Sequence, residues 1–294
     1  MADYSYRLLD SDEVLHTQMK QWHERGVHAV ALDFEGEFNL HIYGEHLCLI
    51  QIFDGVSYFL VDPFLVSPDG LKALLEDENL EKVMFDCASD AALVRKQYGI
   101  TLKAVYDLRI AAKLLGFEGN LTKLIERCLS IPASTGKKGN QTANWLKRPL
   151  RKNLIDYALS DVEHLFAVRS VLEKELLQAD LVGKNSELQK TAALPKGPDK
   201  PGWEKLPGFK YLSKEQKVYL KWFFEARDML AEKLNKPAFQ VLDKRALVAM
   251  AKAVPQDVQT FRRFASHKNQ QIEEDLIALL TVARDGAASE LAQR

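Results

Sequence analysis

Cysteine is scarce in this sequence of 294 residues, which contains only Cys48, Cys87 and Cys128. An odd number of widely separated cysteines does not match the paired frameworks of small secreted domains. The sequence also lacks a CxxC motif and any cluster of cysteine and histidine, which excludes the common structural zinc sites. We therefore expect reduced thiols and a cytoplasmic location.

Long apolar runs and a basic excess are missing as well. No apolar run approaches the ~20 residues that a membrane-spanning helix requires, so we expect no membrane partner. The first residues, MADYSYRLLDSDE, are acidic and lack the basic and apolar regions of a secretory signal. The formal net charge of −1 shows no global basic field, although metal-binding carboxylates can mask a local basic patch.

The remaining composition, 47% hydrophobic and 28% charged, is that of a globular protein long enough for roughly two domains. Short apolar runs predict strands in VHAVALDF, HLCLIQIF, SYFLVD and KVMFD, and DG between the second and third predicts a hairpin turn. Periodicity predicts helices in SPDGLKALLEDENL, opened by Ser67 or Asp69, in DAALVRKQYGI up to Gly99, and across most of 102–178. This order of elements predicts an α/β domain.

The chain changes character near residue 190. The stretch KTAALPKGPDKPGWEKLPGFK is rich in proline, glycine and lysine and has no sustained periodicity, which predicts a linker over 191–210. Helical periodicity follows, and SKEQKVYLKWFFEARDMLAEKLNKP predicts a long amphipathic helix with Ser213 as its N-cap. We expect one domain over 1–190 and a small all-helical domain over 211–294.

Two carboxylates lie two residues apart in ALDFEGE, at the end of a predicted strand. Because the period of a strand is two residues, Asp33 and Glu35 should point to the same face. Like charges so close repel each other unless a cation lies between them, and oxygen ligands suit Mg²⁺ or Mn²⁺. The alternative is an ordinary strand end that enters a polar loop. We expect Gly36 to end the strand and Glu37 to lie on the surface.

Two further acidic stretches follow. In FDCASDAALVRKQYGI, Asp86 lies at the end of a predicted strand and Asp90 lies in the first turn of the next helix. Each is either an ordinary capping carboxylate or a ligand. In YALSDV, Tyr157 and Asp161 are four residues apart, so they share one face if the segment is helical. Taken alone, such a pair is common on the surface of a helix.

The order and spacing of these stretches resemble the tyrosine subclass of the DEDD superfamily of 3′-to-5′ exonucleases, and most closely ribonuclease D. The matching motifs are LDFEGEF with LCLIQI, then FDCASDAALVRKQYGI, then DYALSDVEHLF. The segment QTANWLKRPL is similar to the W-x-x-RPL segment that precedes the third motif. The resemblance covers roughly residues 5–178, and the helices over about 211–290 look like a helicase-and-RNase-D C-terminal (HRDC) domain.

This resemblance implies an RNase-H-like mixed sheet flanked by helices, which is the fold of the 3′-to-5′ exonucleases. It also implies that two divalent metal ions, Mg²⁺ or Mn²⁺, are bound by four carboxylates: Asp33, Glu35, Asp90 and Asp161. In the same comparison, Tyr157 would orient the attacking water.

Two positions depart from the family pattern. Phe34 lies between the first two carboxylates, where relatives often have Thr or another small residue, and it is a candidate for contact with the terminal nucleotide. Phe85 stands five residues before Asp90, where many ribonuclease D sequences have His. This departure leaves Asp86 as a competitor of Asp90 for the role of metal ligand.

Basic residues surround a tryptophan in the loop GKKGNQTANWLKRPLRK. Basic side chains contact phosphates and aromatic rings stack on bases, a combination that suits a single strand of nucleic acid. Trp145, Lys147 and Arg148 are therefore candidates for substrate binding. Further basic residues of this loop are Lys137, Lys138, Arg151 and Lys152. The alternative is a solvated loop with Trp145 packed beneath it.

We therefore expect a metal-dependent 3′-to-5′ exoribonuclease that trims single-stranded 3′ ends of RNA, such as those of tRNA precursors. A DNA exonuclease of the same superfamily is one alternative. RNA and DNA substrates compared side by side distinguish the two, because a site can recognise the 2′-hydroxyl that only RNA has. A catalytically silent RNA-binding module is another, and the complete set of four carboxylates and a tyrosine argues against it. The lysine-rich linker and the helical domain would extend the RNA track, or would serve packing or protein interaction.

Overall fold

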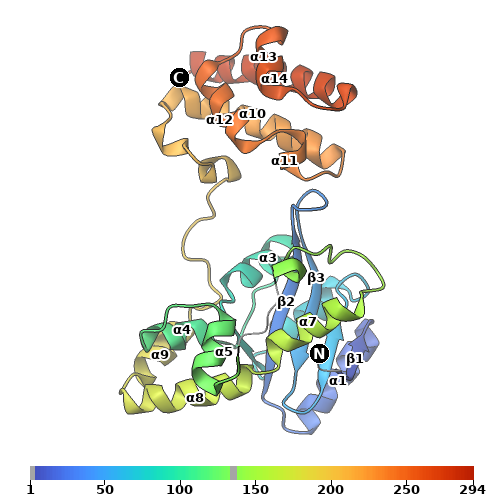
Figure 1. Ribbon diagram of the computed structural model, residues 1–294, viewed down its shortest axis with the longest axis vertical. Helices are drawn as coiled ribbons and strands as arrows, with labels where there is room; N and C mark the ends of the chain where they lie inside the picture. The colour runs from blue at the N-terminus through green and yellow to red at the C-terminus, as the bar shows by residue number, and fades with distance from the viewer. Residues whose placement is uncertain (1–3, 133–137) are drawn as a thin grey trace. The chain divides into compact units, whose positions relative to one another are not determined.

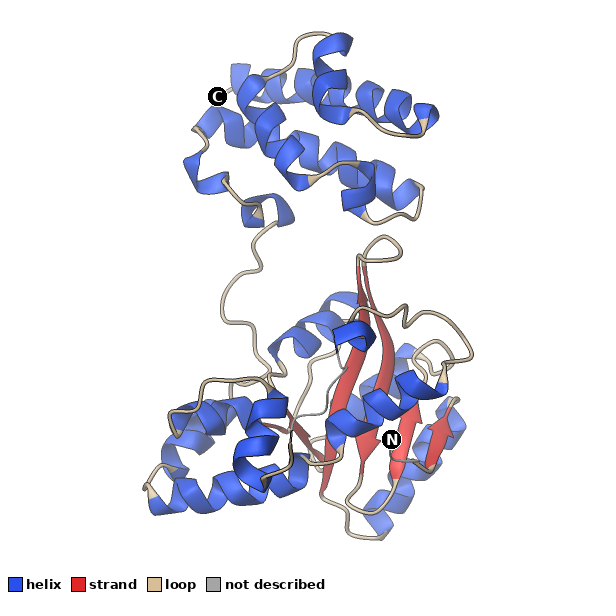
Figure 2. Cartoon of the chain, viewed as in Figure 1, coloured by secondary structure: helices blue, strands red, loops and turns tan. Residues whose placement is uncertain are grey.

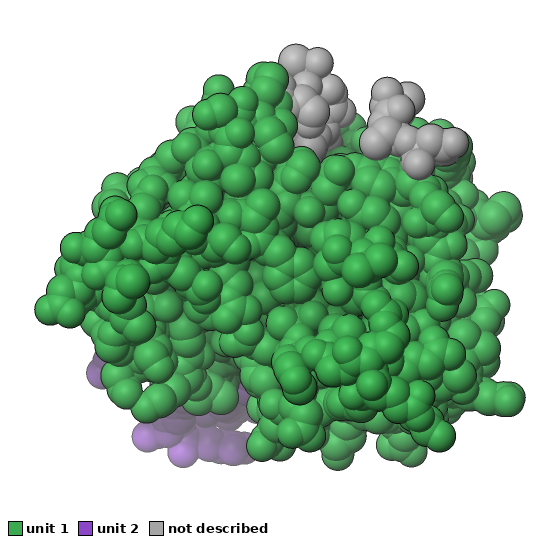
Figure 3. Space-filling view, turned by 90° about the horizontal axis from the view of Figure 1, so that it is seen from below, with its two compact units in different colours: residues 1–37, 45–196 green, residues 38–44, 197–294 purple. Residues whose placement is uncertain are grey.

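The computed structural model describes residues 4–132 and 138–294. The chain divides into two compact units, which Figure 3 shows in different colours: Met1–Glu37 with Glu45–Lys196, and Phe38–Gly44 with Gly197–Arg294. The domain boundaries expected at residues 190 and 211 stay predictions. None of the helices in the described ranges combines the length and the apolarity that crossing a membrane requires.

Strands are interspersed with helices in the first part of the chain, and helices alone follow (Figures 1 and 2). The strands are β1 (Tyr6–Leu9), β2 (Ala29–Phe38), β3 (Glu45–Phe53), β4 (Tyr58–Val61), β5 (Glu81–Met84) and β6 (Val105–Asp107). The helices of the first unit are α1 (Asp12–Glu24), α2 (Pro68–Leu75), α3 (Ala88–Tyr98), α4 (Leu108–Leu114), α5 (Leu121–Leu129), α6 (Lys138–Gln141), α7 (Lys152–Val162), α8 (Leu165–Gln178) and α9 (Val182–Gln189).

The six strands form one mixed sheet in the order β1-β4-β3-β2-β5-β6. β3 and β4 pair antiparallel with Phe53 opposite Tyr58, which places the predicted DG turn in the hairpin that joins them. β1 pairs in parallel with β4, and β5 pairs in parallel with both β2 and β6. This is the mixed sheet that the resemblance to the exonucleases implies.

Alternate residues of β2 belong to two different core clusters. The even-numbered residues from Val30 to Phe34 pack in a core cluster with α1, α2 and α3. Ala31 packs on the other side in a cluster with α4, α5 and α8, where α7 also packs against β3 and β4. Asp33 and Glu35 follow Ala31 at the strand period of two, so they belong to this second face.

Local signals in the sequence place several element ends correctly. Ser67 caps α2, because its hydroxyl accepts a hydrogen bond from the Gly70 N–H at 3.1 Å. Gly99 ends α3 with a left-handed φ of +69°, which a glycine adopts without strain. Ser213 caps α10 (Lys214–Lys233) through a capping box with Gln216.

Other elements differ from the expectation. β1 and β6 are absent from it, because strands of four and three residues carry too little alternation to be recognised. β2 continues through Gly36 to Phe38, and Glu37 is only 1% exposed, so the expectation of a surface Glu37 is wrong. β3 is the hydrogen-bonded neighbour of β2, and this pairing keeps the chain extended past the glycine.

The second unit is helical. Its elements are η1 (Gly202–Lys205), η2 (Phe209–Tyr211), α10, α11 (Ala238–Val241), α12 (Lys244–Ala253), α13 (Val258–Ala265) and α14 (Gln270–Ala292). Phe223 and Phe261 are fully buried in its core, with ring planes at 90°. Residues 197–294 contain 17 Lys and Arg against 13 Asp and Glu, so this unit is positively charged although the whole chain is not.

Candidate active site

Three carboxylates converge beside the sheet. Asp33 and Glu35 come from β2, where the strand period places both on the face that α7 and α8 cover. Asp161 comes from α7. One carboxylate oxygen of each residue lies within 4.8 Å of those of the other two. The three side chains thus form a single acidic cluster.

Glu35 shows the electrostatic consequence of this proximity. Burial raises the pKa of Glu35 well above its ordinary value, and the negative charges of Asp33, Asp161 and Asp90 raise it further. Each cause disfavours another negative charge in the cluster. A divalent cation would offset the repulsion, and carboxylate oxygens are ligands that hard cations such as Mg²⁺ prefer. The donor set therefore fits a divalent metal ion.

Tyr157 lies one helical turn before Asp161 on α7. The two side chains share a hydrogen bond, and burial together with the charges of Asp161 and Glu35 raises the pKa of Tyr157 above its ordinary value. The phenol therefore keeps its proton at neutral pH, and this proton is available for the hydrogen bond with Asp161. Its ring lies 6.2 Å from that of Trp145, centre to centre.

The second motif places its two acids differently. Asp86 forms an ion pair with Arg109. Asp90 lies in the first turn of α3, and its charge helps to raise the pKa of Glu35. Burial raises the pKa of Asp90 itself to about 7, with Asp86 and Asp107 adding to the effect. Among the described residues, Asp90 is not one of the three acids that lie within 4.8 Å of one another. Its role as the fourth ligand stays a prediction.

A cavity of about 330 Å³ borders the carboxylates. Its lining residues are Asp33, Phe34, Glu35, Phe85, Asn120, Leu121, Thr122, Gln141, Tyr157, Asp161 and Leu165. Sequence reasoning does not identify Asn120, Thr122 and Gln141. Asn120 is the N-cap of α5 and accepts a hydrogen bond from the Lys123 N–H at 3.1 Å, so its sequence signal is that of a helix start.

A buried glutamine on β3 also contacts the cluster. Gln51 is fully buried, and its Nε2 donates to Asp33 Oδ2 at 3.4 Å. Its Oε1 has no hydrogen-bond partner among the residues that the structure describes. Gln51 lies in the LCLIQI stretch of the first motif, but nothing in the sequence assigns it a role. In the structure it helps to orient Asp33.

Arg148 holds the loop that precedes α7. Its guanidinium donates to the Asp62 carboxylate at 2.6 and 3.0 Å and to the Cys48 carbonyl at 2.6 Å, and it lies 4.8 Å from the centre of the Phe64 ring. Trp145 is 1% exposed, which corresponds to the alternative of a tryptophan packed beneath the loop. Trp145 therefore faces the protein, whereas Arg148 is held by these contacts and keeps 29% of its side chain exposed. Contact of either residue with a substrate stays a prediction.

The other candidates for substrate binding differ in exposure. Lys147 is exposed. Phe34 is buried in the core cluster on the opposite face of β2 from the carboxylates, although it contributes to the cavity wall. Lys137 and the side chain of Lys138 lie outside the described residues. Contact of any of these residues with a substrate stays a prediction.

Comparison with known proteins places this site in a family. A family model described as a 3′-5′ exonuclease matches residues 11–177, and a model of the HRDC domain matches residues 216–283. Ribonuclease D of Xanthomonas oryzae pv. oryzae is 26% identical over 261 residues, which cover 85% of this chain and 71% of that protein. Ribonuclease D of Pseudomonas paraeruginosa is 28% identical over 252 residues, which cover 84% of this chain and 65% of that protein.

A solved structure shows the same fold. The crystal structure of Escherichia coli RNase D, an exoribonuclease involved in structured RNA processing, matches with a TM-score of 0.74 and 22% identity, over 95% of this chain and 75% of that one. The predicted fold and the resemblance to ribonuclease D are confirmed, including the HRDC domain. The chain spans about two-thirds of the length of the two ribonuclease D relatives. Because the exonuclease model matches more than half of its residues, the chain belongs to the 3′-5′ exonuclease family.

Proposed function

We propose that this protein is a metal-dependent 3′-to-5′ exoribonuclease that shortens RNA by hydrolysing its terminal phosphodiester bonds. The observation that carries the proposal is the convergence of Asp33, Glu35 and Asp161, with Tyr157 hydrogen-bonded to Asp161. Membership of the 3′-5′ exonuclease family and similarity to ribonuclease D proteins support the same reaction.

Four carboxylates would hold two divalent ions, Mg²⁺ or Mn²⁺: Asp33, Glu35, Asp90 and Asp161. When bound, such ions lower the pKa of water and offset the charge that develops on the leaving 3′-oxygen. The Tyr157 hydroxyl, held beside the cluster by its hydrogen bond with Asp161, would orient the attacking water through its oxygen, since the rate depends on the alignment of the nucleophile. Gln51 keeps the Asp33 carboxylate oriented toward the cluster.

The cavity suits one unpaired terminal nucleotide, because its volume of about 330 Å³ lies near the lower end of the range for small-ligand sites. Phe85 and Leu121 supply apolar surface for a base. Asn120 and Thr122 line the same cavity with polar groups and are the candidates for contact with the 2′-hydroxyl. Lys147 is exposed and is the candidate for a phosphate contact.

The helical unit also carries a surface that suits a single RNA strand. Lys214, Lys217 and Lys221 are spaced three and four residues apart, so they lie along one face of α10. They line a cavity of about 440 Å³ together with Trp203 and Phe209, and Lys217 Nζ lies 4.7 Å from the centre of the Phe209 ring. Such a combination binds phosphates and stacks bases, so we assign this unit to holding RNA away from the reacting end.

An RNA with a single-stranded 3′ tail and a DNA of the same sequence, incubated side by side with Mg²⁺, test the proposal. We expect stepwise shortening of the RNA from its 3′ end by the wild-type protein and a loss of that shortening in Asp33→Asn. Glu173→Gln is a matched control, because it removes a carboxylate that lies outside the cluster.

Each alternative predicts a different result in this experiment. Faster shortening of the DNA would favour a DNA exonuclease. Binding of RNA without shortening would favour the silent RNA-binding module. Shortening of RNA by Asp33→Asn at the wild-type rate would show that the cluster is not the active site.

The setting of the reaction is also proposed. The cysteines are free, and Cys48 and Cys87 are buried, which suits a reducing compartment such as the cytoplasm. Structured RNA, such as a tRNA precursor, is the proposed substrate class, in line with the description of the related Escherichia coli enzyme.

A further inference from the structure

The turn between β5 and α3 sets the position of Asp90, because Asp90 lies in the first turn of α3. This turn has little local support. Asp86 has a left-handed backbone with φ of +61°, a conformation that residues with a side chain rarely adopt. Cys87 is the N-cap of α3 and makes no side-chain capping hydrogen bond in the described part of the chain. The hydrogen-bond acceptor that stabilises this turn therefore has to come from another element.

Asp107, at the end of β6, is that partner. Its Oδ1 accepts the N–H of Asp86 at 2.8 Å, and its Oδ2 accepts the N–H of Cys87 at 3.1 Å. Oδ1 also accepts the N–H of Arg109 at 2.8 Å, so the same carboxylate caps α4. One side chain that is only 4% exposed thus ties the start of α3 to the start of α4.

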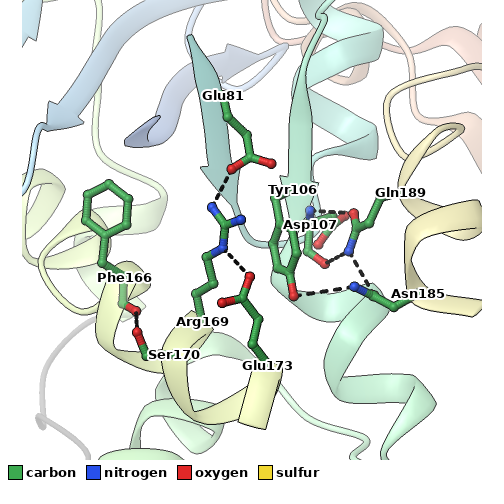
Figure 4. Close-up of polar contacts among 9 residues, drawn as sticks. All are labelled: Glu81, Tyr106, Asp107, Phe166, Arg169, Ser170, Glu173, Asn185 and Gln189. Carbon is green, nitrogen blue, oxygen red and sulfur yellow. Dashed lines mark hydrogen bonds and ion pairs between the residues drawn. The ribbon is translucent and has the colours of Figure 1, made fainter. Parts of the chain in front are cut away.

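Helix α9 holds Asp107 in place, as Figure 4 shows. Gln189 brackets the backbone of Asp107: its Oε1 accepts the Asp107 N–H at 2.7 Å, and its Nε2 donates to the Asp107 carbonyl at 3.0 Å. Nε2 also donates to Asn185 Oδ1 at 3.1 Å, and Asn185 Nδ2 donates to the Tyr106 hydroxyl at 3.4 Å. Because Gln189 donates and accepts at once, an amide is required here, and side-chain volume alone is not sufficient.

We propose that Asp107 and Gln189 are positioning residues for Asp90, which act through the β5–α3 turn and so set the affinity of the site for divalent metal. This inference rests on the proposed function of the carboxylates as metal ligands. Groups that orient metal ligands commonly contribute about 10–100-fold to metal affinity. The exonuclease family model ends at residue 177, so this proposal gives α9, which lies beyond the matched residues, a role in the metal site.

Titration of the full chain with Mn²⁺ in a calorimeter tests the inference with two shape-preserving substitutions. Asp107→Asn replaces one acceptor by a donor, so it cannot accept all three N–H groups. Gln189→Glu places an oxygen against the Asp107 carbonyl. We expect each variant to bind Mn²⁺ about 10-fold more weakly than the wild type. Hydrogen exchange of the backbone over residues 85–91 should also be faster, because the turn loses its acceptor or the support of that acceptor.

Arg169→Met is the control, because Arg169 belongs to the same region and contacts Glu81, Glu173 and the ring of Tyr106 (Figure 4). It should lower stability while leaving the Mn²⁺ affinity and the exchange of the turn unchanged. Wild-type Mn²⁺ affinity in both test variants would overturn the positioning role alone. A wild-type protein that binds no Mn²⁺ would contradict the metal site itself, so the two failures are distinguishable.

Discussion

Two groups of acidic side chains in this exonuclease domain differ in the charges that surround them. In the first, Glu35 lies among Asp33, Asp90 and Asp161, and these like charges raise its pKa. In the second, Arg169 lies between two glutamates: it forms an ion pair with Glu81, and its Nε lies 2.7 Å from Glu173 (Figure 4). Arg169 also lies 4.3 Å from the centre of the Tyr106 ring.

The difference separates an acidic group that stabilises the fold from one that needs a ligand. In the Arg169 group, opposite charges and a flat aromatic ring satisfy one another within the protein. Around Glu35, proximity of carboxylates raises the free energy of the folded protein, and a bound proton or a bound cation would lower it. We therefore expect substitutions in the two groups to affect different properties: catalysis and metal binding in one, stability in the other.

The largest expected difference is between two variants that each replace one carboxylate by an amide, one in each group. Asp161→Asn should lower the rate of RNA shortening by about 1,000-fold or more, roughly 4 kcal/mol of transition-state stabilisation, because a ligand position and the partner of Tyr157 change together. Glu173→Gln should stay within about twofold of the wild-type rate. Single-turnover assays on a 3′-tailed RNA measure both. Similar losses in the two variants would remove the distinction between the groups.

Arg169→Met should destabilise the folded protein by about 2 kcal/mol, because two partly exposed ion pairs, with Glu81 and Glu173, and the contact with the Tyr106 ring are lost together. Denaturation by urea, followed by circular dichroism, measures the free energy of unfolding. The rate of RNA shortening per folded molecule should be unchanged. A stability equal to that of the wild type would show that the Arg169 group does not stabilise the fold.

Tyr157→Phe should lower the rate of RNA shortening by about 100-fold, roughly 2.7 kcal/mol, because the hydroxyl that aims the water is lost. The ring stays in place beside Trp145, so Mn²⁺ affinity should remain close to that of the wild type. Rates at saturating Mn²⁺, together with calorimetric titrations, separate these effects. If the variant lost Mn²⁺ binding along with activity, Tyr157 would be part of the metal site and not a group that orients water.

Lys82 extends the comparison to a buried cation. Its Nζ donates to the Asp77 carbonyl at 2.5 Å, and burial lowers the pKa of Lys82 from 10.5 to about 8. Between these two values the unfolded chain binds more protons than the folded protein, so the stability of the wild type should rise with pH. Relative to Lys82→Met, we expect a gain of about 2 kcal/mol from pH 7.5 to pH 9.5. Urea denaturation of both proteins across this range measures it, and parallel pH profiles would contradict it.

The parts of the site that the sequence predicts are encoded by short-range periodicity. Asp33 and Glu35 share a face because they are two residues apart on a strand, and Tyr157 and Asp161 share a face because they are four residues apart on a helix. Four of the six strands, the hairpin and the caps at Ser67 and Ser213 follow from similar local signals. Such patterns are readable because the geometry of one element is sufficient to interpret them.

The parts that the sequence does not predict depend on contacts between distant segments. Asp107 lies on a strand of three residues and meets Gln189, which is 82 positions away. Arg148 belongs to a basic loop and is predicted to bind RNA, and the sequence gives no sign of its hydrogen bond with Asp62, 86 positions away. A local pattern carries no information about such partners, so these roles become visible only in three dimensions.

The metal site itself is tested most directly by a crystal of the protein soaked in Mn²⁺, with anomalous scattering recorded from the ion. We expect an anomalous peak among Asp33, Glu35 and Asp161, with Asp90 completing the site, and none beside Glu81 and Glu173. A fully soaked crystal without a peak at the first group, or with its strongest peak at the second, would contradict the assignment of this cluster as the active site.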